Sequence, residues 1–169
     1  MIIRQEQPAD HDAVYRVVKE AFLNAEHTDG NEQDLVVQLR ESKSFIPELS
    51  LVAVENEKIV GHILFTRAAV NGTQVLALAP LSVLPEYQNR GIGQALIREG
   101  HRVAKRLGYP YCVVLGHKTY YPRLGYVPAS QYGIKAPFEV PDENFMALKL
   151  SSSAEPIHGT VEYGKSFGI

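Results

Sequence analysis

The sequence predicts an α+β fold in which a mixed, mostly antiparallel and twisted sheet is flanked by helices. Three observations lead to this prediction. Strand and helix patterns alternate along the chain with no linker, repeat or low-complexity block between them. Strand patterns within residues 49–84 follow one another after short turns, as antiparallel strands do. An amphipathic helix pattern then separates two apolar strand patterns, which is typical of a parallel pair.

The first part of the chain is expected to form one strand and two helices. Residues 2–6, IIRQE, form a short first strand. A helix opens at Pro8, and apolar residues recur at helical spacing over 13–21; a second helix covers 31–42. The polar segment NAEHTDG, at 24–30, is a loop between the two helices.

Three antiparallel strands are expected next, over 49–55, 58–70 and 74–84. The sequence NGT at 71–73 is a strong turn signal between the last two. Pro80 interrupts the last of them, which is the fourth strand of the chain. Because proline has no N–H for a ladder hydrogen bond, this position predicts a bulge that splays the fourth strand from its next neighbour.

The remaining patterns complete the sheet. An amphipathic helix is expected from Gly93 to Gly108, lying on the sheet. The apolar run YPYCVVLG, which ends at Gly116, is expected to be a central fifth strand, covered on both faces and parallel to the fourth. A short helix or turn and two further strands are predicted at 119–126, 145–150 and 159–163.

Composition and charge limit the classes of function. With 169 residues, of which 45% are hydrophobic and 21% charged, the chain can bury one core, so one domain over 1–169 is expected. The net charge of -2 provides no general attraction to nucleic acid or to an anionic membrane. The polar N-terminus and the lack of a long apolar run predict a cytoplasmic protein. The single cysteine, Cys112, excludes an internal disulfide and a cysteine metal cluster, and no metal is expected.

The segment YQNRGIGQAL, residues 87–96, places two glycines where a strand passes into a helix. Gly91 and Gly93 let a ligand approach the main chain, and the first amides of a helix bind anions. Two other phosphate motifs are excluded, because no Lys-Ser or Lys-Thr pair follows and Leu96 stands where a third glycine would be. The pattern Gln-x-x-Gly-x-Gly, starting at Gln88, remains as a candidate phosphate site.

The splayed fourth strand adds to this candidate. A gap beside it would leave backbone groups unpaired near Leu81 to Val83. An extended ligand with amides of its own could pair there like another strand, with its phosphates at the glycine segment. The arm of coenzyme A has this chemistry.

The segment LSVLPEYQNRGIGQALI resembles the acyl-CoA-binding motif of the GNAT superfamily of N-acyltransferases. The segment YYPRLGYVPA resembles its later motif, in which a tyrosine precedes a glycine-aromatic pair by four residues. The resemblance covers about residues 1–150, and VLGHKTYYPRLGYVPA is further similar to a branch of small bacterial acetyltransferases. It implies a GNAT-like fold and acetyl-CoA as co-substrate. Tyr126 replaces the commoner phenylalanine, and the superfamily has no invariant general base to carry over.

Carried over residue by residue, the resemblance implies a coenzyme site and an acid. Tyr121 falls at the tyrosine that often protonates the leaving thiolate, whereas Tyr120 is expected to pack. The implied cofactor-binding residues are Leu81, Ser82 and Val83 along the pantetheine, and Gln88, Asn89, Arg90, Gly91, Ile92, Gly93 and Gln94 around the pyrophosphate.

The base and the acceptor contacts are open to both functional and structural interpretations. Glu26 and His117 are candidate catalytic residues, and the alternatives are a solvated loop residue and a turn cap, respectively. His27 and His62 are candidate substrate contacts, and the alternatives are a solvated loop residue and a core strand histidine.

The expected activity is acetyl-CoA-dependent N-acetyl transfer by direct attack of an amine in a ternary complex. The alternatives are a catalytically silent acyl-CoA-binding sensor and an interaction module whose glycines serve only turns. The acceptor stays open among a small metabolite, an antibiotic, a polyamine and a protein amine, and a homodimer stays open as well. Acidic residues over 26–34 favour a cationic acceptor.

Overall fold

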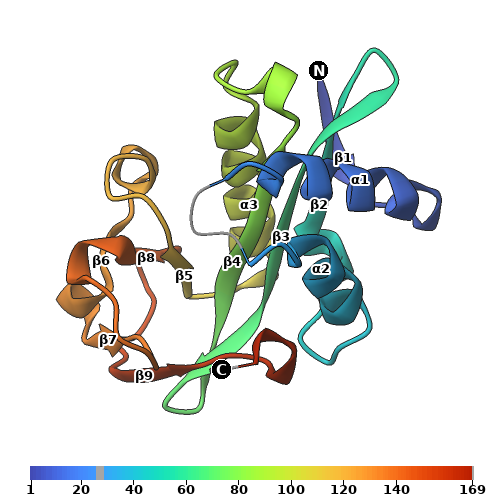
Figure 1. Cartoon of the computed structure of the whole chain (residues 1–169). Coiled ribbons are helices and arrows are strands. Elements are labelled where there is room, and N and C mark those ends of the chain that lie inside the picture. The colour runs from blue at the N-terminus through green and yellow to red at the C-terminus, as the bar shows by residue number, and fades with distance from the viewer. Residues whose placement is uncertain (26–28, 169) are drawn as a thin grey trace.

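The computed structural model describes residues 1–25 and 29–168 and has the mixed, mostly antiparallel α+β architecture that the sequence predicts (Figure 1). The α-helices of this part are α1 (His11–Phe22), α2 (Glu32–Arg40) and α3 (Ile92–Leu107). Its strands are β1 (Ile2–Gln5), β2 (Ser50–Glu55), β3 (Lys58–Val70), β4 (Thr73–Val83), β5 (Tyr111–Leu115), β6 (Val127–Pro128), β7 (Ile134–Lys135), β8 (Phe145–Lys149) and β9 (Gly159–Glu162). The helix expected from Pro8 opens as a 3₁₀ turn, Pro8–Asp10, before α1.

The sheet runs in the order β1-β2-β3-β4-β5-β8-β6, and within this order the neighbours are antiparallel except for the parallel pair β4 and β5. The far end of β3 also pairs with β9, which in turn pairs in parallel with β7. The helix α3 connects β4 to β5, as a crossover between parallel strands requires.

The bulge that Pro80 predicts is present in β4. Between Ile63 and Phe65 of β3 the register shifts, because the facing part of β4 contains one extra residue. The pairing of β4 with β5 is confined to Leu76 and Ala77. Beyond Ala77 the two strands diverge, so the end of β4 has no strand neighbour on that side in the part of the chain that the structure describes.

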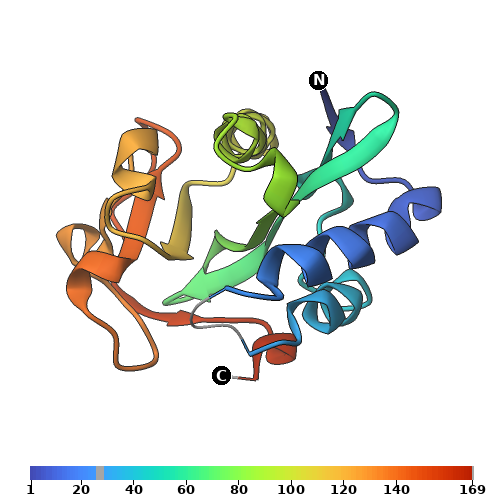
Figure 2. The same ribbon diagram turned by 45° about the horizontal axis from the view of Figure 1, so that its top comes forward.

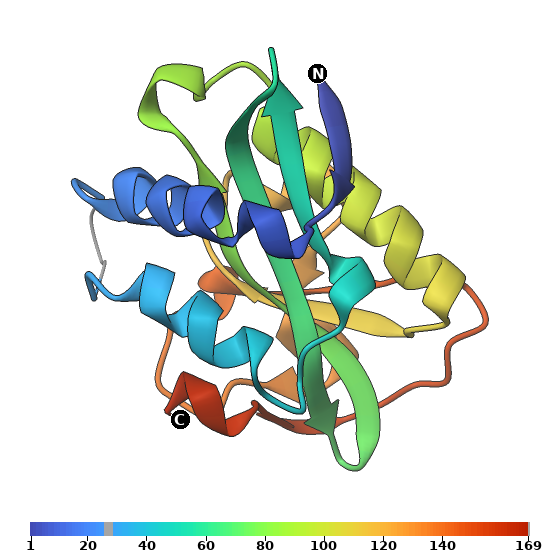
Figure 3. The same ribbon diagram turned by 90° about the vertical axis from the view of Figure 1, so that its right-hand side faces the viewer.

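Helices cover both faces of the central strands. In Figures 2 and 3, α3 lies on one face, and α1 and α2 lie together on the opposite face. The face under α3 holds a large apolar core that includes Phe65, Leu96 and Ile97. The ring of Phe65 passes directly over Gly100, where any Cβ would overlap it. This packing fixes α3, and with it the segment that precedes α3, against the middle of the sheet.

The chain after β5 forms a second apolar cluster at the other edge of the sheet. Val113 of β5, Phe145 of β8 and Val161 of β9 are buried there together with Ile134 of β7. The short strands β6 and β7 have two residues each and were not expected from the sequence. Within the described ranges, no helix is long and apolar enough to cross a membrane.

Candidate functional site

The segment between β4 and α3 presents main-chain amides at the start of a helix. It contains a 3₁₀ turn, Pro85–Tyr87, and two residues with left-handed backbone, Asn89 (φ 62°) and Gly91 (φ 83°), before α3 begins at Ile92. Gly91 is the N-cap, so no side chain caps the helix, and the first turn of α3 contains no acidic residue. The first amides of α3 and the positive end of its dipole are therefore available to an anion.

A cleft of about 490 Å³ opens beside this segment. Its walls are the end of β4, the turn before α3, the first turn of α3 and the segment after β5. Eight of the ten predicted cofactor-binding residues line it, and the exceptions are Ser82 and Arg90. The structure thus brings most of the predicted coenzyme residues to one cavity.

The two exceptions have clear positions. Ser82 is buried and pairs with His62 across the β3–β4 ladder. The guanidinium of Arg90 lies over the ring of Tyr87, 5.1 Å from its centroid, in a cation–π contact. Gln88 lines the cleft and also donates a hydrogen bond of 3.0 Å from its amide to the carbonyl of Val83. This bond ties the glycine segment to the end of β4.

Tyr120 packs against the apolar core, as expected, and it also lines the cleft, which was not expected. A Cβ built on Gly93 would lie 2.7 Å from the Tyr120 hydroxyl, which means that this tyrosine reaches across to the first turn of α3. Sequence reasoning missed this role because Tyr120 stands just before the 3₁₀ turn Tyr121–Leu124, whose direction depends on how the chain leaves β5. Glycine at position 93 leaves room for both the hydroxyl and a ligand.

Tyr121 is buried beside Tyr120 and is not among the residues that line the cleft. Its ring packs on Gly116 and meets the rings of Tyr120 and Tyr126 edge-on, with centroids 5.1 Å and 5.6 Å away. Burial raises the pKa of the Tyr121 phenol well above its usual value. Among the described residues, its hydroxyl has no hydrogen-bond partner. A group placed beside it would meet a protonated phenol with an unused donor.

The main chain of His117 stabilises the turn that contains Tyr120 and Tyr121. Its carbonyl accepts hydrogen bonds from the amides of Tyr120 and Tyr121, at 3.1 Å and 3.4 Å, while the residue itself is exposed and outside the cleft walls. The turn-capping alternative therefore describes its position. Arg123 and Tyr87 also line the cleft, although they were not among the residues predicted from the sequence. A basic residue two positions after Tyr121 was the available signal for Arg123.

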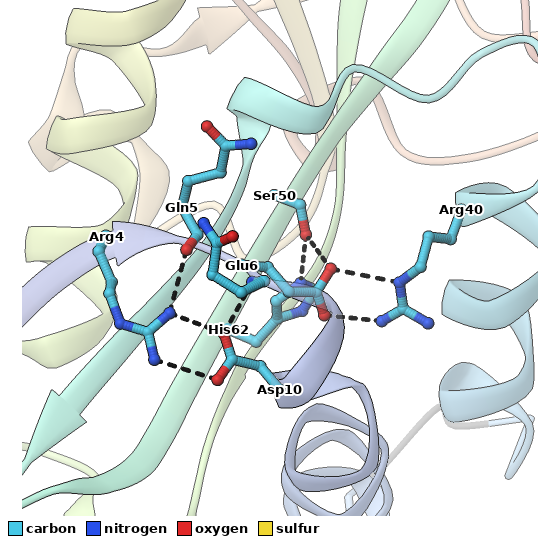
Figure 4. A network of polar contacts seen from close by, with 8 residues as sticks. Arg4, Gln5, Glu6, Asp10, Arg40, Ser50 and His62 are labelled. Carbon is cyan, nitrogen blue, oxygen red and sulfur yellow. Dashed lines mark hydrogen bonds and ion pairs between the residues drawn. The ribbon is translucent and has the colours of Figure 1, made fainter.

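On the other side of the sheet, His62 belongs to a buried polar network that Figure 4 shows. Its Nε2 lies 3.0 Å from the Ser50 hydroxyl, which donates a 2.9 Å hydrogen bond to the Glu6 carboxylate. Glu6 also accepts two hydrogen bonds from Arg40 of α2, at 3.2 Å and 2.7 Å. Burial lowers the pKa of His62 to about 4, so the ring is neutral near pH 7.

A second ion pair borders this network. Arg4 forms a bidentate pair with Asp10, at 2.6 Å and 3.0 Å, and Asp10 also accepts a 2.7 Å hydrogen bond from the amide of Gln7 (Figure 4). The Arg4 guanidinium, more than the amide, holds the pKa of the Asp10 carboxyl below its usual value. These contacts join β1 to the start of α1.

Two predicted site residues, Glu26 and His27, lie outside the described residues. Of the acidic residues near them, Asp34 accepts a 2.9 Å hydrogen bond from Tyr15, and Glu32 accepts one of 3.1 Å from the amide of Asp29. The described residues contain no group of three or more histidine, cysteine or carboxylate side chains that could hold a metal ion.

Comparison with known sequences gives a consistent set of relatives. The model of the acetyltransferase (GNAT) family matches residues 12–126. The uncharacterized N-acetyltransferase YjhQ of Escherichia coli is 45% identical over 132 residues, which are 75% of this chain and 73% of that protein. The uncharacterized N-acetyltransferase YhbS of Escherichia coli is 30% identical over 171 residues, covering 99% of this chain and 98% of YhbS.

Two solved structures share the whole arrangement. The Escherichia coli YhbS structure in complex with CoA has a TM-score of 0.90 and 27% identity, over 99% of this chain and 92% of that one. A GNAT family acetyltransferase from Brucella melitensis in complex with acetyl-CoA has a TM-score of 0.82 and 33% identity, over 98% and 97% of the two chains.

Proposed function

Because the chain belongs to the GNAT acetyltransferase family, we propose that it moves an acetyl group from acetyl-CoA to an amine by direct attack in a ternary complex. The observation that carries this proposal is the cleft at which the divergent end of β4 meets the free amides of α3. Coenzyme A has amides along its arm and a pyrophosphate beyond them, and the cleft offers partners for both. The CoA and acetyl-CoA bound to the two solved relatives support the same co-substrate.

In the proposed complex, the pantetheine arm pairs with the main chain of Leu81 to Val83, where β4 lacks a neighbour. The pyrophosphate accepts hydrogen bonds from amides between Asn89 and Gln94 at the start of α3. Arg123, on the cleft wall, adds a positive charge. Arg90 is held on Tyr87 and would reach a phosphate only by leaving that ring.

The chemistry requires a deprotonated amine, a bound thioester and a proton for sulfur. Two reactants held together supply much of the rate, and no covalent enzyme intermediate is needed. The nitrogen attacks the thioester carbonyl, the C–S bond breaks, and the thiolate takes a proton. We assign the hydrogen-bond donor to the departing sulfur to Tyr121, whose phenol is protonated and has no hydrogen-bond partner among the described residues. Glu26 and His117 are the candidate bases from the sequence, and His27 and His62 the candidate acceptor contacts.

We further propose a class of acceptor and a cellular location. Acidic side chains around the start of α2, such as Asp29 and Glu32, favour a cationic acceptor through their local field. We place the protein in the cytoplasm, with residues 1–169 acting as one catalytic domain. Sedimentation measurements decide whether two copies associate.

The test is a turnover screen combined with calorimetry. Release of CoA thiol is measured from acetyl-CoA with spermidine, an aminoglycoside, free lysine, an arylalkylamine and an alanine-initiated peptide. The proposal expects saturable binding of acetyl-CoA and turnover with at least one of these classes. Binding without any turnover would favour the silent sensor, and absence of binding would favour the interaction module. Equal rates with cationic and neutral amines, unaffected by ionic strength, would contradict the cationic preference.

A further inference from the structure

Three buried polar side-chain atoms of the sheet have no hydrogen-bond partner among the described residues. Two of them belong to neighbouring residues, Nδ1 of His62 on β3 and Oγ of Ser82 on β4, and the third is Oγ1 of Thr66 on β3. His62 and Ser82 are direct partners in the β3–β4 ladder, so their side chains project from the same face with neighbouring Cβ atoms. Buried polar groups are nearly always satisfied, and an unpaired one needs an explanation. Two of them lie side by side, and Ser82 stands between the cleft-lining residues Leu81 and Val83, which points to use during the reaction.

The hydrogen bonds around Ser50 fix the tautomer of His62. A serine hydroxyl has one hydrogen, and the Ser50 hydrogen is donated to the Glu6 carboxylate, which can only accept. The contact between Ser50 Oγ and His62 Nε2 must therefore be donated by the imidazole, so Nε2 carries the hydrogen. The lone pair of the neutral ring is then on Nδ1, the atom that has no partner.

We infer that His62 is the general base of the transfer, oriented by Ser50 and Glu6, and that it receives the amine proton through the hydroxyl of Ser82. This inference rests on the proposed function. Ser82 stands between Leu81 and Val83, whose side chains line the coenzyme cleft, while its own side chain projects to the opposite face. Rotation about χ1 of Ser82 turns its hydroxyl between His62 and an amine that approaches the edge of β4 from the side of α1 and α2.

In the proposed step, the amine loses one proton and the thioester loses its C–S bond. The amine nitrogen forms its bond to the thioester carbon and becomes positively charged, which makes its N–H acidic enough for a weak base. That proton passes to the oxygen of Ser82 while the Ser82 hydrogen passes to Nδ1 of His62. The imidazolium keeps its Nε2 hydrogen on Ser50, beside the Glu6 carboxylate. The C–S bond breaks, Tyr121 donates a hydrogen bond to the developing thiolate, and the proton that His62 received passes through solvent to the sulfur.

The charged groups that act on the ring come from two elements. Glu6, which follows β1, favours the protonated ring, and Arg40 of α2 disfavours it. The neighbouring strands contribute only uncharged partners in register with His62, namely Val52 on β2 and Ser82 on β4. The ring is therefore neutral before the reaction, and Glu6 is the one group in this set that stabilises the imidazolium.

The test compares wild type with the His62→Gln protein, using the amine of the turnover panel that wild type acetylates fastest. The glutamine amide can replace the Nε2–H donor to Ser50, but it has no basic lone pair at Nδ1. We expect kcat to fall about 10²- to 10⁴-fold, with the KM for acetyl-CoA and the melting temperature close to wild type. We also expect kcat of the variant to rise about tenfold per pH unit above pH 8, since hydroxide then removes the proton. A structural lesion would lower kcat by the same factor at every pH.

Three further variants complete the test. Ser82→Ala removes the relay hydroxyl and should lower kcat at unchanged KM for acetyl-CoA. Ser50→Ala should lower kcat about tenfold and abolish the Nε2–H tautomer in ¹⁵N NMR, whereas Ser50→Thr restores both. If wild type turns over and His62→Gln matches it, the inference fails and the proposed function stands. If wild type turns over no amine, the proposed function itself fails. A Nδ1–H tautomer in wild type, or normal kcat in Ser82→Ala, would also overturn the inference.

Discussion

The two sides of β4 are built on opposite principles. On the side of α3, the cleft is open and many of its polar groups are main-chain amides, so its chemistry depends on backbone shape and on Gly91 and Gly93. On the side of α1 and α2, the polar groups are the buried side chains of Glu6 and His62 and the partly buried side chain of Arg40, connected in one chain of contacts. The first arrangement suits a ligand that is the same in every reaction. The second suits the control of a single proton.

The largest expected effect is on turnover, when the Tyr121 hydroxyl that serves the departing sulfur is removed. Tyr121→Phe should lower turnover about 10²- to 10⁴-fold while acetyl-CoA affinity, measured by calorimetry, stays near wild type. The reference pKa of a phenol, about 10, is above that of a thiol, about 8.5, and burial raises the Tyr121 value further. The hydroxyl therefore acts best by donating a hydrogen bond to the developing thiolate.

Tyr120→Phe is the matched control for that prediction. Tyr120 lines the cleft beside Gly93, so losing its hydroxyl should change coenzyme affinity slightly and turnover less than Tyr121→Phe does. A dead Tyr120→Phe enzyme with an active Tyr121→Phe enzyme would move the acid by one residue. Full activity in both variants would remove a tyrosine acid from the mechanism.

The next largest effect is on stability, when the buried Glu6 carboxylate loses its ion pair with Arg40. Arg40→Ala leaves the Glu6 carboxylate buried without its cation, and it should lower the free energy of unfolding by about 3–5 kcal/mol in urea denaturation. The control is Arg102→Ala, which breaks an exposed pair with Glu99 on α3 and should lower the free energy of unfolding far less. Equal costs for the two variants would contradict the burial of the Glu6–Arg40 pair.

The third effect concerns the open side. Gly91→Val places a side chain where the pyrophosphate would approach, and acetyl-CoA affinity should fall by well over tenfold as charge-assisted hydrogen bonds are lost. Gly72→Val is the control, because Gly72 has the same φ of 83° and the same open surroundings in the turn before β4. If both variants bind acetyl-CoA normally, the pyrophosphate does not lie on this segment.

The smallest effect is a pH dependence of stability. Burial lowers the pKa of His62 and of His101 to about 4, below the reference value of about 6.5. The unfolded chain thus binds more protons between these values, so stability is complete above pH 6.5 and is lost as pH falls toward 4. Each ring should contribute about 1 kcal/mol of loss between pH 7 and pH 5.5. The slope should become shallower in His62→Gln, and an unchanged slope would contradict burial of a neutral ring.

Periodicity and local chemistry predicted most of the fold. The apolar pattern of 58–84, the turn at 71–73 and Pro80 were enough for the hairpin, the bulge and the splayed edge, because each depends on neighbours in the chain. The glycine segment was predictable for the same reason, because the backbone freedom and small size of Gly91 and Gly93 are properties of those residues alone. These features require no knowledge of distant contacts.

The unpredicted parts depend on contacts between distant residues. The network that positions His62 joins Glu6 to Ser50, 44 residues apart, and to Arg40, 34 residues apart. No pattern in the sequence relates three such positions until the strands are in register. Tyr120 faces the cleft only because of how the chain turns after β5. The two-residue strands β6 and β7 are too short for any periodicity to appear.

The divergence of β4 from β5 also bears on solubility. A strand edge with unpaired N–H and C=O groups can recruit a strand of another molecule and start aggregation. Here the unpaired stretch lies inside a cleft that has α3 and the Tyr120 segment as walls. These walls stand beside the edge where another strand would have to pair, and Pro80 has no N–H to donate along it. The same geometry that creates a binding edge therefore protects the protein from self-association along it.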